Sequence, residues 1–345
     1  MKTKETLILE ADQSGFAAAG RIIRRGGLVV FPTETVYGLG ANALDAGACA
    51  GIFAAKGRPQ DNPLIVHTAD VFALARLAGD VPPRAAALIQ AFMPGPLTLI
   101  LPKKPDIPDT VTAGLPTVGL RVPSDPAAAA FLRHAEVPVA APSANLSGRP
   151  SPTSFAMARA AMEGRVDAII RAEDSRVGLE STIVRVTESA LEILRPGGIS
   201  EEQLRLAAGG CEIRGSFSEN SGGPPPAPGM KYAHYKPKAE TLLFRTAAQR
   251  RACEVYCAGA GKKLGVILLA DSLNAERAAA DTKNVITRQM LSAQEYARRL
   301  YAEFFVFDRL GCDVILAQYP PVEGIGRAIA NRLLKAADGR FAEGL

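Results

Sequence analysis

Short apolar segments alternate with amphipathic ones over the first two hundred residues. Apolar runs bounded by glycine or proline are typical of buried strands, and we expect strands at 27–33, 64–68, 97–101, 118–122, 137–141, 168–171 and 181–186. Apolar positions at helical spacing predict helices at 13–25, 46–55, 84–92, 126–134 and 153–162. This alternation indicates an α/β domain with ligand-type loops at its strand ends.

The alternation stops at 216–238, which reads S-F-S-E-N-S-G-G-P-P-P-A-P-G-M-K-Y-A-H-Y-K-P-K. Its content of Gly, Pro and Ser predicts a linker with polyproline character. Two tyrosines, a histidine and three lysines follow the proline run, and a passive spacer does not need such side chains.

A second pattern of strands and helices follows the linker. We expect strands at 240–244, 264–269 and 313–316, and helices at 247–257, 293–307 and 326–337. The helix at 293–307 carries Tyr296, Leu300, Phe304 and Phe307 on one stripe. The chain is therefore expected to divide into a domain at 1–215, a linker at 216–238 and a smaller β-α-β domain at 239–345.

Composition favours a soluble globular protein, since 48% of the 345 residues are hydrophobic and 22% are charged. No apolar run approaches the ~20 residues that cross a bilayer, and the N-terminal residues lack an apolar signal core. Five scattered cysteines form no C-x-x-C pair. We therefore expect a cytoplasmic protein with reduced thiols, without a zinc site or a disulfide framework.

The formal charge of +5 is unevenly distributed. Residues 1–215 hold 22 basic and 22 acidic residues, whereas residues 216–345 hold 18 and 13. A surface that faces a polyanion would therefore belong to the linker and the second domain.

Two glycine-rich segments imitate nucleotide-binding motifs. Residues 38–43 match G-x-G-x-x-A, but no helix opens at Gly40, and we expect a tight turn there. Residues 259–263 lack the spacing of a phosphate loop, so a hairpin or a helix-to-strand loop is expected. The three histidines, His67, His134 and His234, never have metal-ligand spacing, and no G-x-S-x-G elbow occurs. These absences disfavour zinc hydrolases and nucleophilic hydrolases.

Five loops concentrate side chains for which an apolar core has no use. They read F-P-T-E-T-V-Y-G (31–38), A-K-G-R-P-Q-D-N-P-L (55–64), T-V-G-L-R-V-P (117–123), A-P-S-A-N-L-S-G (141–148) and G-L-E-S-T (178–182). Lys56 and Arg58 either suit the C-terminal dipole of a helix or clamp a phosphate. Arg121 lies inside an apolar strand, so it must meet an internal carboxylate or an anionic group of a ligand. Cations and hydroxyls without a nucleophile–base pair suit phosphoryl or nucleotidyl transfer. The residues alone therefore indicate an enzyme or a binder of a nucleotide and a small polar molecule.

In order and content, these loops resemble the YrdC-like threonylcarbamoyl-AMP synthases. The shared motifs are F-P-T-E-T-V-Y-G-L, K-x-R-P-x-x-N-P-L, P-G-P-x-T, G-x-R-x-P, P-S-A-N-x-S-G, G-L-E-S-T-I-V and R-P-G, over about residues 7–210. The linker motif P-G-M-K-Y-A-H-Y-K-P and the further domain resemble the long form of the family. The resemblance implies a catalytic domain with a twisted mixed sheet and flanking helices, followed by a smaller Rossmann-like β-α-β domain.

The resemblance also implies a reaction. L-threonine, bicarbonate and ATP, with Mg²⁺ accompanying the nucleotide and no metal held by the protein, would give threonylcarbamoyl-adenylate and pyrophosphate. A separate threonylcarbamoyl transferase complex would then modify the adenosine next to the anticodon of tRNA. The resemblance leaves direct contact with tRNA open and implies no membrane partner.

Site residues follow from the same resemblance. Those implied to contact threonine are Thr35, His67, Arg121 and Ser181, with Thr33 as the alternative to Thr35. Those implied to hold the nucleotide are Lys56, Arg58, Asn62, Thr117, Ser143, Asn145, Ser151, Arg195 and Tyr235, with Tyr232 as the alternative to Tyr235. Lys56 and Arg58 are also the implied catalytic residues, and the linker would act as a lid over the site.

Two other functions compete with this interpretation. A non-catalytic RNA-binding module would bind RNA in a salt-sensitive manner without turning over ATP. A carbamoyl-transfer maturation factor for metalloenzymes would be expected to carry cysteine-rich zinc modules, and the absence of C-x-x-C disfavours it.

Overall fold

The computed structural model describes residues 4–215, 225–228, 235–270 and 284–343. Contacts divide the chain into two compact units, the first made of Met1–Ser147 and Ser151–Tyr232, the second of Gly148–Pro150 and Ala233–Leu345. The described parts of the expected linker fall into both units, because 225–228 belongs to the first and 235–238 to the second.

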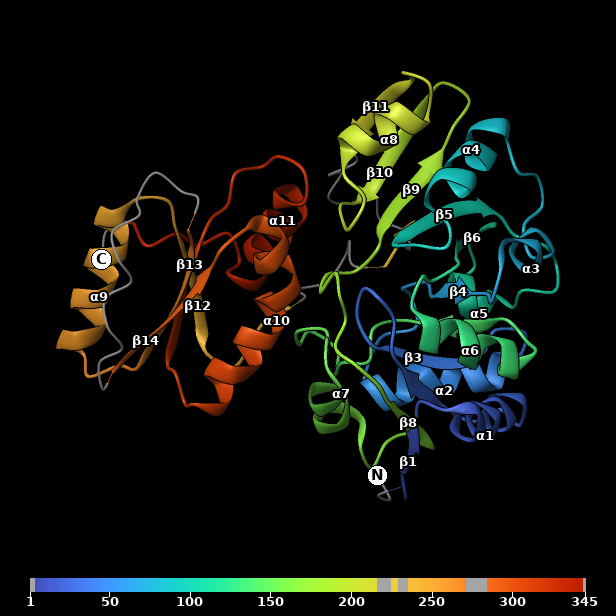
Figure 1. The fold of residues 1–345 in the computed structure, drawn as a ribbon, viewed down its shortest axis with the longest axis horizontal. Coiled ribbons are helices and arrows are strands. Elements are labelled where there is room, and N and C mark those ends of the chain that lie inside the picture. The colour runs from blue at the N-terminus through green and yellow to red at the C-terminus, as the bar shows by residue number, and fades with distance from the viewer. Residues whose placement is uncertain (1–3, 216–224, 229–234, 271–283, 344–345) are drawn as a thin grey trace. The chain divides into compact units, whose positions relative to one another are not determined.

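The first unit is built on one mixed sheet (Figure 1). Its strands are β1 (Leu7–Glu10), β2 (Val29–Phe31), β3 (Gly38–Asn42), β4 (Ile65–His67), β5 (Leu97–Pro102), β6 (Thr117–Arg121), β7 (Val139–Ala141), β8 (Ala168–Arg171), β9 (Thr182–Val186), β10 (Ala190–Arg195) and β11 (Glu212–Gly215). Their order in the sheet is β1-β8-β2-β3-β7-β4-β6-β5-β9-β10-β11. The sheet contains parallel pairs such as β4–β6 and β5–β9 and antiparallel pairs such as β5–β6.

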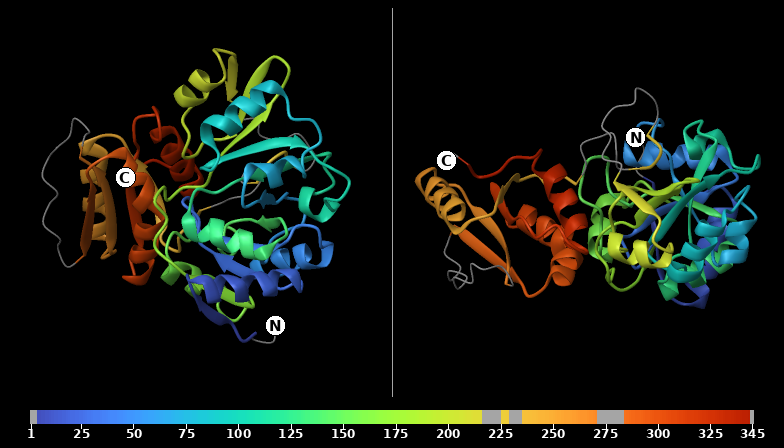
Figure 2. Two further views of the ribbon diagram at one scale, coloured as in Figure 1. Left: turned by 45° about the vertical axis from the view of Figure 1, so that its right-hand side comes forward. Right: turned by 90° about the horizontal axis from the view of Figure 1, so that it is seen from above.

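Helices flank this sheet (Figure 2). They are α1 (Gln13–Arg24), α2 (Ala46–Lys56), α3 (Val71–Ala75), α4 (Pro83–Phe92), α5 (Asp109–Thr112), α6 (Pro126–Ala135), α7 (Phe155–Met162) and α8 (Glu201–Ala207). Side-chain caps mark where several of these helices begin. Asp12, Asp45 and Asp125 accept backbone N–H groups in the first turns of α1, α2 and α6, which satisfies donors that the helix leaves unpaired.

The two faces of the sheet are covered differently. On one face, apolar residues of α2, α4 and α7 pack against alternate residues of β2 to β8 in the larger core cluster. On the other face, α1 and α6 cover only the part around β2, β7 and β8, where Phe16 and Phe131 meet Phe31 and Val139. The same face of β4, β6, β5 and β9 contributes only a small apolar cluster, and polar side chains replace the core beside it.

The second unit contains a four-stranded parallel sheet in the order β12-β15-β13-β14. Its elements are β12 (Glu240–Phe244), α9 (Ala247–Gly259), β13 (Leu264–Leu269), β14 (Val285–Met290), α10 (Ala293–Arg309), β15 (Val314–Gln318) and α11 (Gly326–Ala336). Helix α9 lies on one side of this sheet and α10 and α11 on the other (Figures 1 and 2). The four residues of the predicted stripe, Tyr296, Leu300, Phe304 and Phe307, are fully buried.

The predicted fold class is confirmed: a mixed sheet with flanking helices and a separate parallel α/β unit. The tight turn expected at 38–43 is wrong, since Gly38–Asn42 forms β3 between β2 and β7. The helix-to-strand loop expected at 259–263 is confirmed between α9 and β13. The sequence prediction did not include β1, β10, β11, β14, α3, α5 or α8. No helix in the described ranges is long and apolar enough to cross a membrane.

Candidate functional site

A row of polar side chains crosses the part of the sheet face that α1 and α6 leave uncovered. His67 on β4 pairs in register with Arg121 on β6. Leu99 on β5 pairs with Leu120, so that Thr98 lies next to Arg121 on the other side. Cross-strand neighbours share one face of a sheet. His67, Arg121 and Thr98 therefore lie side by side, and all three are buried.

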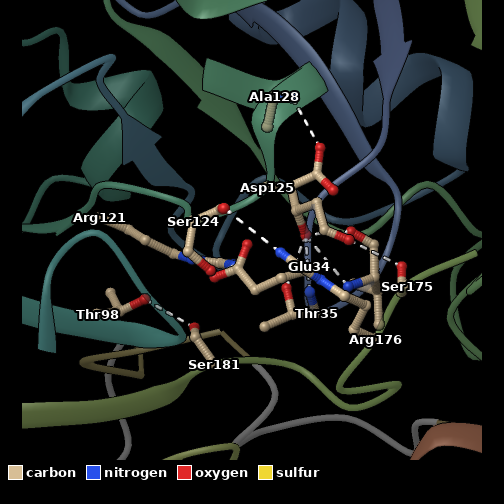
Figure 3. A network of polar contacts seen from close by, with 12 residues as sticks. Glu34, Thr35, Thr98, Arg121, Ser124, Asp125, Ala128, Ser175, Arg176 and Ser181 are labelled. Atoms are coloured by element: carbon tan, nitrogen blue, oxygen red, sulfur yellow. Dashed lines mark hydrogen bonds and ion pairs between the residues drawn. The ribbon is translucent and has the colours of Figure 1, made fainter. Parts of the chain in front are cut away.

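Arg121 meets an internal carboxylate, which is one of the two outcomes that its position predicted. Its Nη2 lies 2.7 Å from Oε1 of Glu34, and the two side chains are 5% and 3% exposed. Glu34 belongs to the loop that joins β2 to β3, so the pair connects this loop to the middle of the sheet (Figure 3). Burial of an ion pair costs several kcal/mol of desolvation per charge, and a functional site is one setting in which such a cost is retained.

His67 is held in its neutral form. Burial, and after it the positive charge of Arg121, lowers its pKa to about 3, although carbonyl groups of Ile65 and Val139 act in the opposite direction. Nδ1 lies 3.1 Å from the Ile65 carbonyl oxygen, and the ring makes an edge contact with Phe31. A neutral, buried imidazole can exchange hydrogen bonds with a hydroxyl group without adding charge to the site.

Hydroxyl and guanidinium groups continue the row towards β9 and β10. Thr98 Oγ1 and Ser181 Oγ are 2.7 Å apart. Arg195, at the end of β10, donates through Nη2 to Ser181 Oγ at 3.1 Å and to its carbonyl oxygen at 3.0 Å. Gly197 makes this possible, because a Cβ there would lie 2.3 Å from the carbonyl oxygen of Glu180. The R-P-G turn thus packs directly on the backbone that carries Ser181.

Lys56 ends α2 and points into the loop that follows β7. Its Nζ donates to the Ser143 carbonyl oxygen, to the Asn145 carbonyl oxygen at 2.6 Å and, more weakly, to Asn145 Oδ1 at 3.4 Å. Burial and the nearby charge of Arg58 hold the pKa of Lys56 well below its usual range, and the Glu180 carboxylate partly offsets this. The structure therefore brings Lys56, Ser143 and Asn145 together.

The loops around this lysine carry three further predicted residues, Ser151, Arg58 and Asn62. Ser151, fully buried, donates to Glu180 Oε1 at 2.5 Å. Arg58 donates to the carbonyl oxygens of Asn62 and Pro63 at 3.2 and 3.1 Å. The Asn62 side chain is fully buried, and neither its nitrogen nor its oxygen has a hydrogen-bond partner among the described residues. An unsatisfied buried amide of this kind is a natural contact for a ligand.

The loop geometry favours Thr35 over Thr33 as a ligand contact. Thr33 Oγ1 donates to the Val36 carbonyl oxygen at 2.6 Å and accepts from backbone N–H groups of the loop. The single hydroxyl proton of Thr33 is thereby used, so Thr35, 2.8 Å away, must donate to Thr33. The lone pairs of the Thr35 oxygen remain to accept a hydrogen bond.

A segment of the expected linker lies on this sheet face. Ala227 is fully buried against Ile65, Ile100, Ile183 and Leu194. The carbonyl oxygen of Pro228 lies 3.5 Å from Nη1 of Arg195. Residues 225–228 therefore rest on the apolar strip directly beside the polar row.

The remaining predicted residues have different surroundings. Thr117 lies on β6 two positions before Gly119, and alternation places it on the same sheet face as Arg121. Tyr235 belongs to the second unit, where its ring stacks on Tyr301 at 5.5 Å and Arg332 lies over it. Tyr232 and the other linker residues at 216–224 and 229–234 lie outside the described residues.

The sequence prediction missed three residues of this arrangement, namely Glu34, Thr98 and Glu180. Glu34 had a detectable signal, because an arginine inside an apolar strand requires a carboxylate nearby and Glu34 is an acid that directly follows a buried strand. No three His, Cys, Asp or Glu side chains in the described ranges are grouped so that they could hold a metal ion.

Comparison with known protein families gives matches along nearly the whole chain. The model of a family described as telomere recombination matches residues 21–197. A model for the C-terminal domain of threonylcarbamoyl-AMP synthase matches residues 199–338.

Individual relatives match over similar lengths. The threonylcarbamoyl-AMP synthase of Bacillus subtilis is 40% identical over 348 residues, which cover 99% of each chain. The enzyme of the same name from Pyrococcus abyssi is 43% identical over 94% of each chain. A crystal structure of Pyrococcus abyssi Sua5 complexed with L-threonine superimposes with a TM-score of 0.89 at 41% identity, over 97% of this chain and 99% of that one.

Proposed function

The chain belongs to the threonylcarbamoyl-AMP synthase family, and we propose that it makes L-threonylcarbamoyl-adenylate from L-threonine, bicarbonate and ATP with release of pyrophosphate. The observation that carries this proposal is the continuous polar row on one sheet face, from His67 through Arg121 and Thr98 to Ser181 and Arg195. The enzyme's product would serve a separate transferase that modifies tRNA next to the anticodon.

In this proposal, threonine lies over the middle of the row. The Nε–Nη2 edge of Arg121 has no hydrogen-bond acceptor among the described residues, so it can donate two parallel hydrogen bonds to a carboxylate. Ser181 and neutral His67 lie in the same row, and Thr35 has acceptor capacity left. These groups suit the hydroxyl group of an amino acid such as threonine.

The nucleotide would lie between the polar row and the end of α2. Its contacts are proposed to be Lys56, Arg58, Asn62, Thr117, Ser143, Asn145, Ser151 and Arg195. The cations supply positive charge for the phosphates, and the unsatisfied amide of Asn62 supplies a donor and an acceptor. Residues 225–228 would close over the site, and Tyr235 as a contact of the nucleotide stays a prediction.

The chemistry needs no nucleophilic side chain. The amine of threonine reacts with bicarbonate to give a carbamate and water, and a carbamate oxygen then attacks the α-phosphorus while the bond to pyrophosphate breaks. The protein's task is to hold the two reactants in line and to stabilise the charge that builds up on the phosphates. Mg²⁺ is proposed to arrive on the ATP phosphates, since the described residues offer no cluster of metal ligands.

The test measures pyrophosphate release by the purified full chain. We expect release only when threonine, bicarbonate and ATP are all present, together with an AMP-linked product that contains threonine. Release that does not depend on threonine would contradict the proposal.

A matched pair of variants tests the site. Arg58→Ala removes a proposed phosphate contact and should abolish the threonine-dependent release. Arg159→Ala removes an exposed arginine of α7, paired only with Glu163 among the ion pairs of the described residues, and should leave it unchanged. Near-normal turnover in Arg58→Ala would show that Arg58 is not a phosphate contact.

A further inference from the structure

The ion pair between Glu34 and Arg121 has unused hydrogen-bonding capacity on both sides. Nη2 and Oε1 are 2.7 Å apart, but the contact is an ion pair without an aligned hydrogen bond. Both carboxylate oxygens of Glu34 and the Nε and Nη2 atoms of Arg121 lack hydrogen-bond partners among the described residues. Buried groups that are this polar are almost always satisfied in a working protein, so this pair is incomplete without a ligand.

The charges of the pair define the kind of ligand that can complete it. Together the two side chains are neutral, and they are only 5% and 3% exposed. An anionic ligand would leave Glu34 facing excess negative charge. A cationic ligand would leave Arg121 facing excess positive charge. A ligand with an anionic and a cationic group on neighbouring atoms balances both partners, and uncompensated buried charge is expensive.

We propose that Glu34 binds the α-ammonium group of the substrate amino acid while Arg121 binds its α-carboxylate. This inference rests on the proposed function, and it assigns to Glu34 a specificity role in the same site. The ligand would complete an alternating arrangement of four charges. Figure 3 shows Glu34 facing Arg121, with Thr35 next to Glu34.

This arrangement makes the amino group a requirement for tight binding. A hydrogen bond between charged partners is worth more than one between neutral groups. A hydroxy acid with the same carboxylate and side chain would leave Glu34 without its partner. Glu34 would also place the nitrogen that must become the carbamate nitrogen at a fixed point in the polar row.

The test combines a protein variant with a ligand that lacks the ammonium group. (R)-3-hydroxybutanoate keeps the carboxylate and the hydroxyl group of L-threonine and lacks only its amino group. Binding of both ligands is measured by isothermal titration calorimetry with the full chain and with Glu34→Gln. We expect Glu34→Gln to weaken threonine binding by about 10- to 100-fold and to leave binding of the hydroxy acid unchanged within about threefold.

A merely structural role of Glu34 gives a different result. If Glu34 only orients Arg121, the variant loses affinity for both ligands equally, because both use the carboxylate contact. That outcome, or an unchanged affinity for threonine, would overturn the inference. Glu163→Gln, at an exposed glutamate of α7, is the matched control and should change neither affinity.

A second variant covers the case in which Glu34→Gln does not fold. Glu34→Asp keeps the charge opposite Arg121 but withdraws the carboxylate by one methylene, and thermal unfolding verifies that it is folded. It should show the same selective loss for threonine, and an equal loss for both ligands would again refute the role.

The outcomes also separate this inference from the proposed function. A chain that synthesises threonylcarbamoyl-adenylate but shows no selective loss in either variant overturns the inference alone. A chain that shows the selective loss but releases no pyrophosphate with all substrates present overturns the proposed function alone. A chain that does not bind threonine at all overturns both.

Discussion

The buried neutral histidine predicts a specific loss of stability in acid. His67 has a folded-state pKa of about 3, compared with 6.5 for an exposed histidine. Because the folded pKa is lower than the unfolded one, the unfolded chain binds the proton first as the pH falls. The stability that His67 contributes is therefore complete above pH 6.5 and is lost progressively between pH 6.5 and about 3.

The magnitude follows from the two pKa values. One pKa unit corresponds to about 1.4 kcal/mol. Between pH 7.5 and pH 5.0 the unfolded state gains about 2 kcal/mol from protonation of this one residue, while the folded state gains almost nothing. Burial of the ring is the main physical cause of this difference, and the positive charge of Arg121 adds to it.

Two measurements check this prediction. Urea unfolding of the parent chain and of His67→Gln at pH 7.5, 6.0 and 5.0 gives the difference in pH dependence, which cancels the contribution of other titrating groups. The free energy of unfolding of the parent should fall by about 2 kcal/mol more than that of the variant. The chain holds only three histidines, so proton NMR can follow the imidazole of His67 directly.

The reasoning would be refuted by either of two results. An imidazole signal of His67 that titrates near pH 6 would show that the ring is not held neutral. Parallel stability curves for the parent and His67→Gln would show that its protonation is not coupled to folding.

Three further predictions follow from the site. Arg121→Met leaves the Glu34 carboxylate buried without its partner and should lower the free energy of unfolding by about 3–5 kcal/mol. In urea unfolding, the double variant Arg121→Met with Glu34→Leu should recover most of the lost stability. Equal stability of the single and double variants would contradict this. Gly197→Ala places a Cβ 2.3 Å from the Glu180 carbonyl oxygen, so thermal unfolding should reveal a loss of about 1–3 kcal/mol, and an unchanged melting temperature would count against the close packing. Ala227→Asp puts a carboxylate into an apolar niche and should reduce threonine-dependent pyrophosphate release at least about tenfold, whereas Ala227→Gly should retain it; full activity of the aspartate variant would show that docking of 225–228 is not needed.

The local pattern of hydrophobic and polar residues was sufficient to predict most of the helices and strands, but not all of them. Apolar runs of β-branched residues such as those in β4 and β13 are visible as strands in the sequence. β3 is not, because G-L-G-A-N carries no strand pattern, and its conformation comes from pairing with β2 and β7. Position 40 requires glycine, because a Cβ there would lie 2.7 Å from the side chain of Val139 on β7. Only the neighbouring strand reveals that requirement.

The candidate site shows the same division. The residue types of the loops that follow the strands identified these loops as candidate ligand-binding segments. The position of Arg121 in an apolar strand predicted that it needs an anionic partner. Which anion satisfies it depends on the packing of a loop that lies 87 positions earlier in the chain at Glu34. Such distant pairings follow from sheet order, which single-sequence patterns do not contain.

The buried ammonium of Lys56 has a consequence for what this position can tolerate. Three oxygen atoms of the 143–145 loop converge on its nitrogen, and the backbone of Ser147 bonds back to the carbonyl group of Lys56. A compact cation with three donors fits such a cage, whereas the flat, wider fork of arginine does not. Acetylation of this nitrogen would remove both the charge and two of the donors. Lys56 therefore connects the end of α2 to the loop at 143–145. Substitution by arginine, or acetylation, would break its contacts with Ser143 and Asn145 together.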